Sequence, residues 1–387
     1  MFRDKFLRCF LSVVSAISLC VCCLGTVPSA AAISDTEITA PSAVLMEPST
    51  KKILFEKNSH DVRPCASITK VMTLILVFEA IDDGIIDYED TVVSSAHAAG
   101  MGGSDIWLEE GESMSAHEMI KAVVVASAND AAVALAEHIS GSEEEFVRRM
   151  NERAEELGMK DTVFKNCNGL DEEGHLTSAY DVALMSAELI RHEKIFEYSS
   201  IWLDYLRGGE TQIVNTNKLL KSYKGITGLK TGTTSQAGSC MSATAERDGL
   251  SLVAVVLGCE SGTARFSDSA KLLDYGFANF ETRTLSVPDE FLKPITVNGG
   301  MTGEVSLVSA EERKVLVEKG SDKEIVTVAD LPSELDAPVT EGKKIGKVTF
   351  VCEGATVDEF DIFTASESKK MSLGEIYKVL MRQLISL

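Results

Sequence analysis

The sequence predicts an α/β (α+β) fold in which an antiparallel sheet is flanked by a helical cluster. A small all-β domain and a C-terminal amphipathic helix follow. Three observations predict this order. Strand-like segments at residues 42–59 and 228–258 enclose a long stretch of helical patterns. Short strand-like segments recur at intervals of 8–12 residues from about residue 286. The last 17 residues carry apolar side chains at helical spacing.

Residues 1–32 have the pattern of a secretory signal peptide. Arg3, Lys5 and Arg8 precede an apolar run, and small residues lead to a cleavage point after Ala32. An uncleaved membrane anchor is the alternative, and no later segment approaches the roughly 20 apolar residues of a spanning helix. Cleavage removes three basic residues and one acidic residue, so the formal net charge changes from −22 to −24. This acidity argues against nucleic acid as a partner.

Residues 33–283 are predicted to form the first domain. Residues 42–59 alternate apolar and polar side chains about a Pro-Ser-Thr turn, which predicts a β-hairpin. Helical patterns dominate from residue 67 to about residue 191. Residues 228–258 predict two or three antiparallel strands, with Arg-Asp-Gly as a turn, and residues 265–280 predict a closing helix. Strands at both ends of this segment predict one sheet built from both.

Residues 284–365 are predicted to form the small β-rich domain, and residues 366–387 the amphipathic helix. The apolar face of that helix consists of Leu373, Ile376, Tyr377, Leu380, Met381, Leu384 and Leu387. Packing of this face against the protein itself is one interpretation. Because the segment also carries four basic residues, we expect a contact with the membrane surface instead.

The nine cysteines do not predict a disulfide framework or a metal site. Four lie within the predicted signal peptide, and the remaining five are scattered without C-x-x-C spacing. In an exported protein, such thiols indicate burial or a reducing habitat.

The stretch PCASITKVMTLILVFEA, residues 64–80, contains the first candidate for chemistry. Its helix is apolar on every side, yet Ser67 and Lys70 lie one turn apart at its start. A buried lysine is costly unless it is paired or neutral, and a neutral lysine can act as a base toward a serine on the same helix face. An N-cap serine beside a lysine that reaches toward solvent is the alternative.

The spacing S-x-x-K alone is weak evidence, since it occurs three times in the chain. Two further motifs strengthen the middle occurrence. Ser127 and Asn129 form the only S-x-N, inside an apolar run, and Lys230-Thr231-Gly232 falls on a predicted strand. Each motif alone fits a helix cap or a turn, but their order and placement together predict one catalytic site.

These motifs resemble those of the penicilloyl serine transferases, which include penicillin-binding proteins and serine β-lactamases. The similarity extends over about residues 40–283 to the low-molecular-mass D-alanyl-D-alanine carboxypeptidases. It implies a β-lactamase/transpeptidase-like fold and an enzyme that removes the terminal D-alanine from peptidoglycan stem pentapeptides. It also implies β-lactams as inhibitors, no cofactor or metal, and a location at the outer face of the cytoplasmic membrane. The segments that carry it include ASITKVMTLILVFEAI, FKNCNGLDEEGHLTSAYDVALMSAELI and GITGLKTGTTSQAGSCMSATAERDGLSLVAVVLG.

The resemblance also implies a role for each site residue. Ser67 would be the acylated nucleophile, Lys70 its proton acceptor, and Ser127 a proton relay to the leaving group. The remaining roles concern binding. Asn129 would hold the substrate amide, Lys230 would keep the site electropositive, and Thr231 would line the pocket. Gly232 is a further substrate-binding residue, the N–H groups of Thr233 and Ser67 would form the oxyanion hole, and Arg265 would lie near the terminal carboxylate. Taken alone, Arg265 fits a surface charge equally well.

Two positions depart from the family pattern. Ala128 occupies the middle of S-x-N, and Cys65 precedes the nucleophile where a small residue is usual; an inert buried thiol is our interpretation of Cys65. Two other functions stay open. A β-lactamase would need a deacylating base in the loop that contains Asp171, Glu172 and Glu173, and a β-lactam sensor or scaffold would bind without turnover.

Overall fold

The computed structural model describes residues 33–309, 312–320, 325–352 and 354–385, which form two compact units divided between Asn279 and Phe280. The predicted signal peptide, residues 1–32, lies outside the described residues. Within the described part of the chain, no helix has both the length and the apolar character that crossing a bilayer requires.

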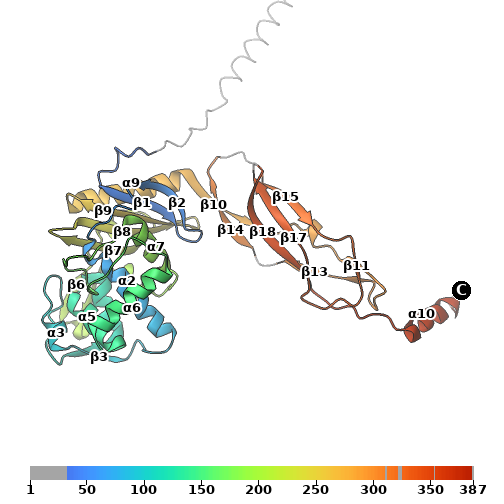
Figure 1. The fold of residues 1–387 in the computed structure, drawn as a ribbon, viewed down its shortest axis with the longest axis horizontal. Helices are drawn as coiled ribbons and strands as arrows, with labels where there is room; N and C mark the ends of the chain where they lie inside the picture. Colours follow the sequence, from blue (N-terminus) through green and yellow to red (C-terminus); the bar gives the residue numbers. More distant parts are fainter. Residues whose placement is uncertain (1–32, 310–311, 321–324, 353, 386–387) are drawn as a thin grey trace, which may run out of the picture. The chain divides into compact units, whose positions relative to one another are not determined.

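The first unit is built on a five-stranded sheet (Figure 1). Its strand order is β2-β1-β9-β8-β7, and every neighbouring pair is antiparallel. The N-terminal hairpin therefore joins the C-terminal strands of the same unit, which confirms the predicted fold. The strands are β1 Ser42–Glu47, β2 Lys52–Lys57, β7 Ile226–Thr234, β8 Gly238–Arg247 and β9 Leu250–Cys259.

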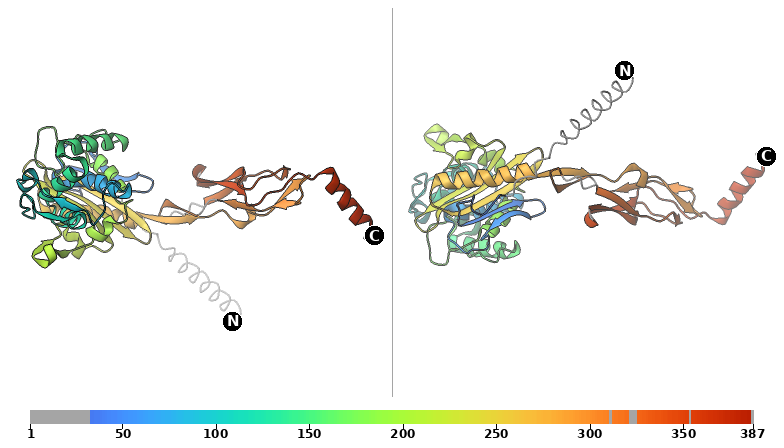
Figure 2. Two further views of the ribbon diagram at one scale, coloured as in Figure 1. Left: turned by 90° about the horizontal axis from the view of Figure 1, so that it is seen from below. Right: turned by 90° about the horizontal axis from the view of Figure 1, so that it is seen from above.

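Helices cover both faces of this sheet (Figures 1 and 2). Helix α9 packs on β8 and β9 from one side, while α7 packs on β1 and β9 from the other and contacts α2 in the helical cluster. The helices are α2 Lys70–Asp82, α3 Ala96–Ala99, α4 Ala116–Lys121, α5 Asn129–Ser140, α6 Glu143–Glu156, α7 Ala179–Leu189, α8 Ile195–Ser199 and α9 Gly262–Asn279.

Shorter elements connect these helices. The antiparallel pair of β3 and β4, with α3 between them in the sequence, interrupts the stretch where the sequence predicts helices, and the hairpin of β5 and β6 follows that stretch. These four strands have only three or four residues each, too few for an alternating pattern to be recognised. The short elements are η1 Ala66–Thr69, β3 Thr91–Val93, β4 Ser113–Ser115, η2 Ala122–Ala126, β5 Leu203–Leu206, η3 Arg207–Gly209, β6 Thr211–Val214 and η4 Lys218–Lys221.

Helix α2 is the buried axis of the cluster. Every side chain from Lys70 to Phe78 is buried, as the all-apolar pattern predicts. Helices α5, α6 and α7 surround it. Because burial of an apolar side chain contributes about 1.5–3 kcal/mol, this packing fixes the start of α2, where Ser67 and Lys70 lie.

The second unit consists of short strands, as predicted, and ends in helix α10. It contains a four-stranded sheet of order β13-β18-β17-β15, a three-stranded sheet of order β12-β11-β16, and the pair β10–β14. Phe350 and Phe360 meet edge to face in its core, 5.3 Å between ring centroids. The elements are β10 Phe280–Leu285, η5 Asp289–Phe291, β11 Ile295–Asn298, β12 Glu304–Val305, β13 Leu307–Ser309, β14 Arg313–Glu318, β15 Ile325–Asp330, β16 Glu334–Asp336, β17 Lys344–Cys352, β18 Ala355–Thr364 and α10 Leu373–Ile385.

Candidate active site

The segment before α2 presents Ser67 at the surface of the cluster. Ala66 has a left-handed backbone, with φ of +50°, and Ser67 follows on the short helix η1. Ser67 is partly exposed, whereas Lys70, the first residue of α2, has no exposed surface. The structure therefore places a partly exposed hydroxyl beside a buried amine.

The Lys70 amine has three oxygen neighbours. Its Nζ lies 3.0 Å from Ser67 Oγ, and it donates to Asn129 Oδ1 and to the Asn168 carbonyl oxygen, both at 2.5 Å. Burial lowers the pKa of Lys70 to about 7, although Cys167 and Asp130 act in the opposite direction. A neutral amine has two protons on the nitrogen for the two carbonyl oxygens, and its lone pair then remains for the Ser67 proton.

Ser127 and Asn129 come from the segment that joins η2 to α5. The chain leaves α4 through the π-helical turn η2, and Ser127 then adopts a left-handed backbone with φ of +62° before α5 begins at Asn129. Such π turns occur frequently at functional sites. Asn129 Nδ2 donates to the Gly102 carbonyl oxygen at 2.6 Å, so the Asn129 amide is oriented with its oxygen toward Lys70.

Strand β7 supplies Lys230, whose Nζ donates to Ser127 Oγ at 2.7 Å. Burial lowers the pKa of Lys230 well below its usual value, and the nearby Lys70 and Arg265 lower it further. Burial therefore opposes the positive charge that is expected of Lys230. The Arg265 guanidinium remains charged and is the permanent cation here.

The next three residues of β7 are Thr231, Gly232 and Thr233, and each has a different environment. The Thr231 hydroxyl is buried and donates to Thr216 Oγ1 at 2.6 Å. A Cβ at Gly232 would lie 2.9 Å from Ser67 N, so only glycine lets β7 approach the nucleophile this closely. Thr233 is exposed, and Arg265 Nη1 donates to its Oγ1 at 2.8 Å and to the Gly232 carbonyl oxygen at 2.9 Å.

The loop at residues 163–175 completes the site, and the motifs did not predict its part. Its Asn168 carbonyl oxygen holds Lys70, and the preceding residue, Cys167, is fixed on both sides. Thr73 Oγ1 donates to the Cys167 carbonyl oxygen at 2.5 Å, and Glu143 accepts from the Cys167 N–H at 3.0 Å. Contacts of backbone groups leave no sequence signal.

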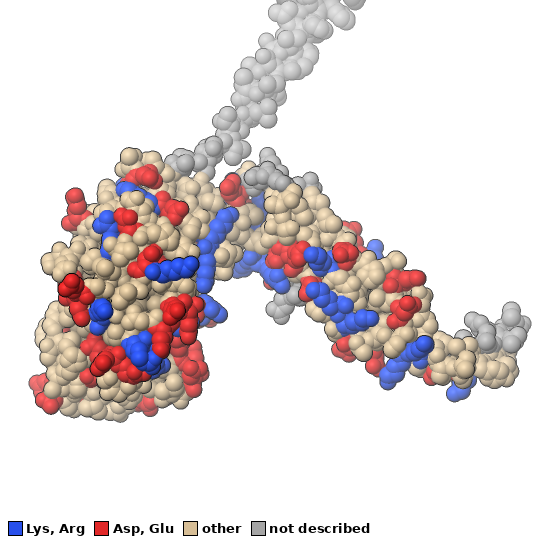
Figure 3. All heavy atoms as spheres, in the orientation of Figure 1, with Lys and Arg blue, Asp and Glu red and all other residues tan. Residues whose placement is uncertain are grey.

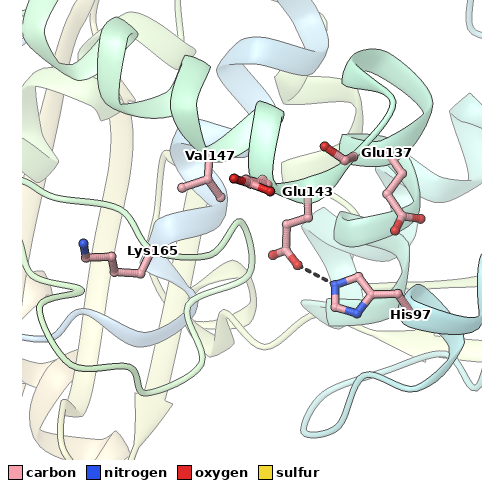
Figure 4. A pocket seen from close by; sticks show the side chains of 7 residues that line it. His97, Glu137, Glu143, Val147 and Lys165 are labelled. Atoms are coloured by element: carbon pink, nitrogen blue, oxygen red, sulfur yellow. Dashed lines mark hydrogen bonds and ion pairs between the residues drawn. The ribbon is translucent and has the colours of Figure 1, made fainter.

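Glu143 also lines a hollow of about 420 Å³ beside this loop (Figure 4). There its second oxygen lies 2.7 Å from His97 Nε2, and Lys165 lies across the hollow. Glu143 thus connects α6 and α3 to the loop that supports Lys70.

The acidic residues of this loop form hydrogen bonds with residues other than Ser67. Asp171 accepts from Thr234 Oγ1 at 2.6 Å, and Glu172 accepts from Asn166 Nδ2 at 3.1 Å. Asp171, Glu172 and Glu173 are all exposed. The loop acids are therefore not arranged as a base for hydrolysis of an acyl-serine.

Burial makes the cysteine near the nucleophile, Cys65, unreactive. All five described cysteines are free thiols. Burial raises the pKa of Cys65 to about 12, so its thiolate is not available at neutral pH.

Two family models match the chain. One, described as D-alanyl-D-alanine carboxypeptidase, matches residues 29–261, and the other, described as penicillin-binding protein 5, C-terminal domain, matches residues 280–370. D-alanyl-D-alanine carboxypeptidase DacF of Bacillus subtilis (strain 168) is 40% identical over 367 residues, covering 92% of this chain and 94% of the relative. DacC of Escherichia coli (strain K12), of the same description, is 34% identical over 345 residues, covering 86% of each.

Solved structures show the same similarity. Penicillin binding protein 5 from Haemophilus influenzae superposes with a TM-score of 0.73 at 31% identity, covering 88% of this chain and 100% of that one. Penicillin-binding protein D2 from Listeria monocytogenes, in the ampicillin-bound form, gives a TM-score of 0.58 at 31% identity over 63% of this chain and 100% of that one.

Proposed function

The chain belongs to the D-alanyl-D-alanine carboxypeptidase family of serine peptidases, and we propose that Ser67 is the nucleophile through which it releases the terminal D-alanine of peptidoglycan stem peptides. One observation carries this assignment. The Lys70 amine lies 3.0 Å from Ser67 Oγ, and burial lowers its pKa to about 7. A base of this pKa is half neutral near physiological pH, which suits proton transfer from a serine.

In the first step Ser67 Oγ attacks the carbonyl carbon of the D-Ala–D-Ala peptide bond. Lys70 takes the hydroxyl proton, a C–O bond forms, and the carbonyl π electrons move to the oxygen. The backbone N–H groups of Ser67 and Thr233 stabilise that oxyanion. Gly232 supports this arrangement, since its lack of a side chain allows β7 to approach Ser67 N closely.

In the second step the C–N bond breaks and the leaving amine of D-alanine takes a proton. Ser127 delivers it from its hydroxyl, which is linked to Lys230 Nζ at 2.7 Å, and the proton that Lys70 took from Ser67 then replaces it on Ser127. Water then attacks the ester carbonyl while Lys70, neutral again, takes a proton from the water. Ser67 Oγ receives that proton as its bond to the carbonyl carbon breaks, which restores the enzyme. No step requires a metal or an organic cofactor, because hydroxyls, amines and backbone donors account for each proton and charge.

The terminal carboxylate of the substrate binds beside Arg265 and Thr233. Arg265 already donates to Thr233 Oγ1 at 2.8 Å, and a carboxylate there would favour the protonated form of Lys230. β-Lactams would acylate Ser67 because they present a strained amide and a carboxylate at similar spacing.

D-Alanine release from diacetyl-L-Lys-D-Ala-D-Ala tests the proposal directly. We expect release by the wild-type chain and none by Ser67→Ala. Release by Ser67→Ala at the wild-type rate would refute the assignment. Penicillin labelling without any release of D-alanine would instead favour the sensor or scaffold, and rapid turnover of nitrocefin would favour a β-lactamase.

We also propose that the enzyme is exported and acts on the cell wall at the outer surface of the membrane, with an effect on cell shape. Residues 1–32 support export by their composition. On the face in Figure 3, acidic side chains are interspersed with basic ones, without a continuous basic surface of the kind that binds nucleic acid.

Helix α10 supports contact with the membrane surface. It begins at Leu373 rather than at the predicted residue 366, and Leu373, Tyr377 and Ile385 have exposed fractions of 86%, 64% and 80%. Successive residues of this set are four or eight positions apart, so they lie along one face of the helix. An exposed apolar face beside Lys369 and Lys370 suits the interface of an anionic bilayer.

A further inference from the structure

His175 is a buried histidine that the proposed mechanism does not use. Only 4% of its surface is exposed, and its ring packs edge-on against Phe164. Its Nδ1 accepts the Lys165 backbone N–H at 3.1 Å. Because a backbone N–H can only donate, Nδ1 carries the lone pair and Nε2 carries the proton. Burial lowers the pKa of His175 to about 4, with Lys165 lowering it and Asp171 and Glu172 opposing, so the ring is neutral at physiological pH.

The Nε2–H of this ring is linked to the residue before the nucleophile. It donates to Thr69 Oγ1 at 2.7 Å, and the Thr69 hydroxyl donates to the Ala66 carbonyl oxygen at 2.9 Å. Cys65 Sγ is 3.4 Å from the same hydroxyl oxygen. The loop that carries His175 is thus connected, through two hydrogen bonds, to the Ala66–Ser67 peptide group.

The orientation of that peptide group matters because a peptide is planar. Its carbonyl oxygen belongs to Ala66 and its N–H belongs to Ser67, so fixing one direction fixes the other. Ala66 holds a left-handed φ of +50° without being glycine, a conformation that persists only where its surroundings enforce it. Gly169, on the same loop as His175, packs so closely that a Cβ there would lie 2.0 Å from the Ala66 carbonyl oxygen.

We propose that His175 and Thr69 are positioning residues for the oxyanion hole, because they orient and polarise the peptide group whose N–H belongs to Ser67. A hydrogen bond accepted by a peptide carbonyl strengthens the N–H of the same peptide as a donor. The inference rests on the proposed function, in which Ser67 is acylated and its N–H stabilises the oxyanion. It also gives Thr69, which lies between Ser67 and Lys70, a defined task.

The carbonyl stretching frequency of the acyl-enzyme reports on this hydrogen bond directly. The ester carbonyl formed from a ¹³C-labelled penicillin lies in the oxyanion hole, and its infrared band moves to higher frequency when the donors weaken. Thr69→Val removes the hydroxyl with little change of shape, and Thr69→Ser keeps it. We expect Thr69→Val to raise the band frequency and to slow acylation about tenfold, less than the loss of a whole donor. Thr69→Ser should keep the wild-type band.

His175 has its own matched pair of variants. His175→Asn retains an acceptor for the Lys165 N–H but cannot reach Thr69, whereas His175→Gln reaches Thr69 with its side-chain amide. We expect His175→Asn to shift the band in the same direction as Thr69→Val, and His175→Gln to restore it. His60→Asn is the control, since His60 is an exposed histidine paired with Asp161, and it should leave both band and rate unchanged.

A structural role alone predicts a different result. If His175 and Thr69 only stabilise the fold, Thr69→Val and His175→Asn will lower the melting temperature while the band stays at the wild-type frequency, which would overturn the inference. Additive rate effects in the double variant would also overturn it, because residues of one relay act through the same bond. If the wild-type chain forms no acyl-enzyme, the proposed function itself fails.

Discussion

Acylation of Ser67 by a β-lactam should accelerate with pH across the neutral range. Burial lowers the pKa of Lys70 to about 7, and only the neutral amine can accept the serine proton. About one eleventh of the amines are neutral at pH 6 and about ten elevenths at pH 8, so we expect the acylation rate constant to rise about tenfold. His175 does not contribute to this change, because burial lowers its pKa to about 4.

The lowered pKa of Lys70 also makes the stability of the fold depend on pH. In the unfolded chain the pKa of Lys70 is near 10.5, so between about pH 7 and pH 10.5 the unfolded chain binds more protons than the folded chain. The Lys70 contribution therefore raises the free energy of unfolding as pH rises through this window. Below this window burial of Lys70 lowers the free energy of unfolding by up to about 5 kcal/mol, because each unit of pKa difference corresponds to 1.36 kcal/mol.

Stopped-flow labelling with a fluorescent penicillin, at constant ionic strength from pH 6 to pH 8, measures the rate. A rate constant that is flat or that falls over this range would refute the role of a neutral Lys70. Lys70→Met should lose labelling, and its free energy of unfolding should rise less between pH 7 and pH 10 than that of the wild type.

Three other changes have distinct expected outcomes. Gly169→Ala places a Cβ 2.0 Å from the Ala66 carbonyl oxygen, at a residue whose φ is +86°. The variant should therefore reduce penicillin labelling at least ~100-fold and lower the free energy of unfolding by ~2 kcal/mol. Labelling near the wild-type rate would contradict this expectation. Asp130→Asn replaces a buried carboxylate that accepts hydrogen bonds from the N–H groups of Ile106 and Leu108, both at 3.0 Å. We expect the free energy of unfolding in urea to fall by ~2 kcal/mol. An unchanged urea midpoint would contradict this expectation. Removal of residues 373–387 should abolish sedimentation with anionic vesicles while D-alanine release in solution persists; undiminished sedimentation would exclude α10 as the anchor.

Elements with long, regular patterns of apolar residues could be predicted from the sequence. The apolar run after Lys70 predicts a helix buried on all sides, and the alternation around residues 42–59 predicts the hairpin that pairs with β9. The three motifs name side chains that the structure brings into contact, since Lys70 reaches both Ser67 and Asn129, and Lys230 reaches Ser127.

Backbone geometry was beyond such patterns. Nothing in a run of alanine and valine signals that residues 122–126 form a π turn, or that Ser127 and Ala66 have a left-handed backbone. The Asn168 carbonyl oxygen holds Lys70 although any residue supplies a carbonyl. Strand β16 of the second unit has only three residues, too few for an alternating pattern to be recognised.

The central claim is that Ser67 is the residue acylated, and mass spectrometry after exposure to penicillin tests it most directly. The intact chain should gain the mass of one penicilloyl group, and digestion should place that group on the peptide containing Ser67. Ser67→Ala should gain none, with Ser49→Ala, another serine of an S-x-x-K spacing, labelled like the wild type. A penicilloyl group on another residue, or labelling of Ser67→Ala at the wild-type rate, would contradict the account.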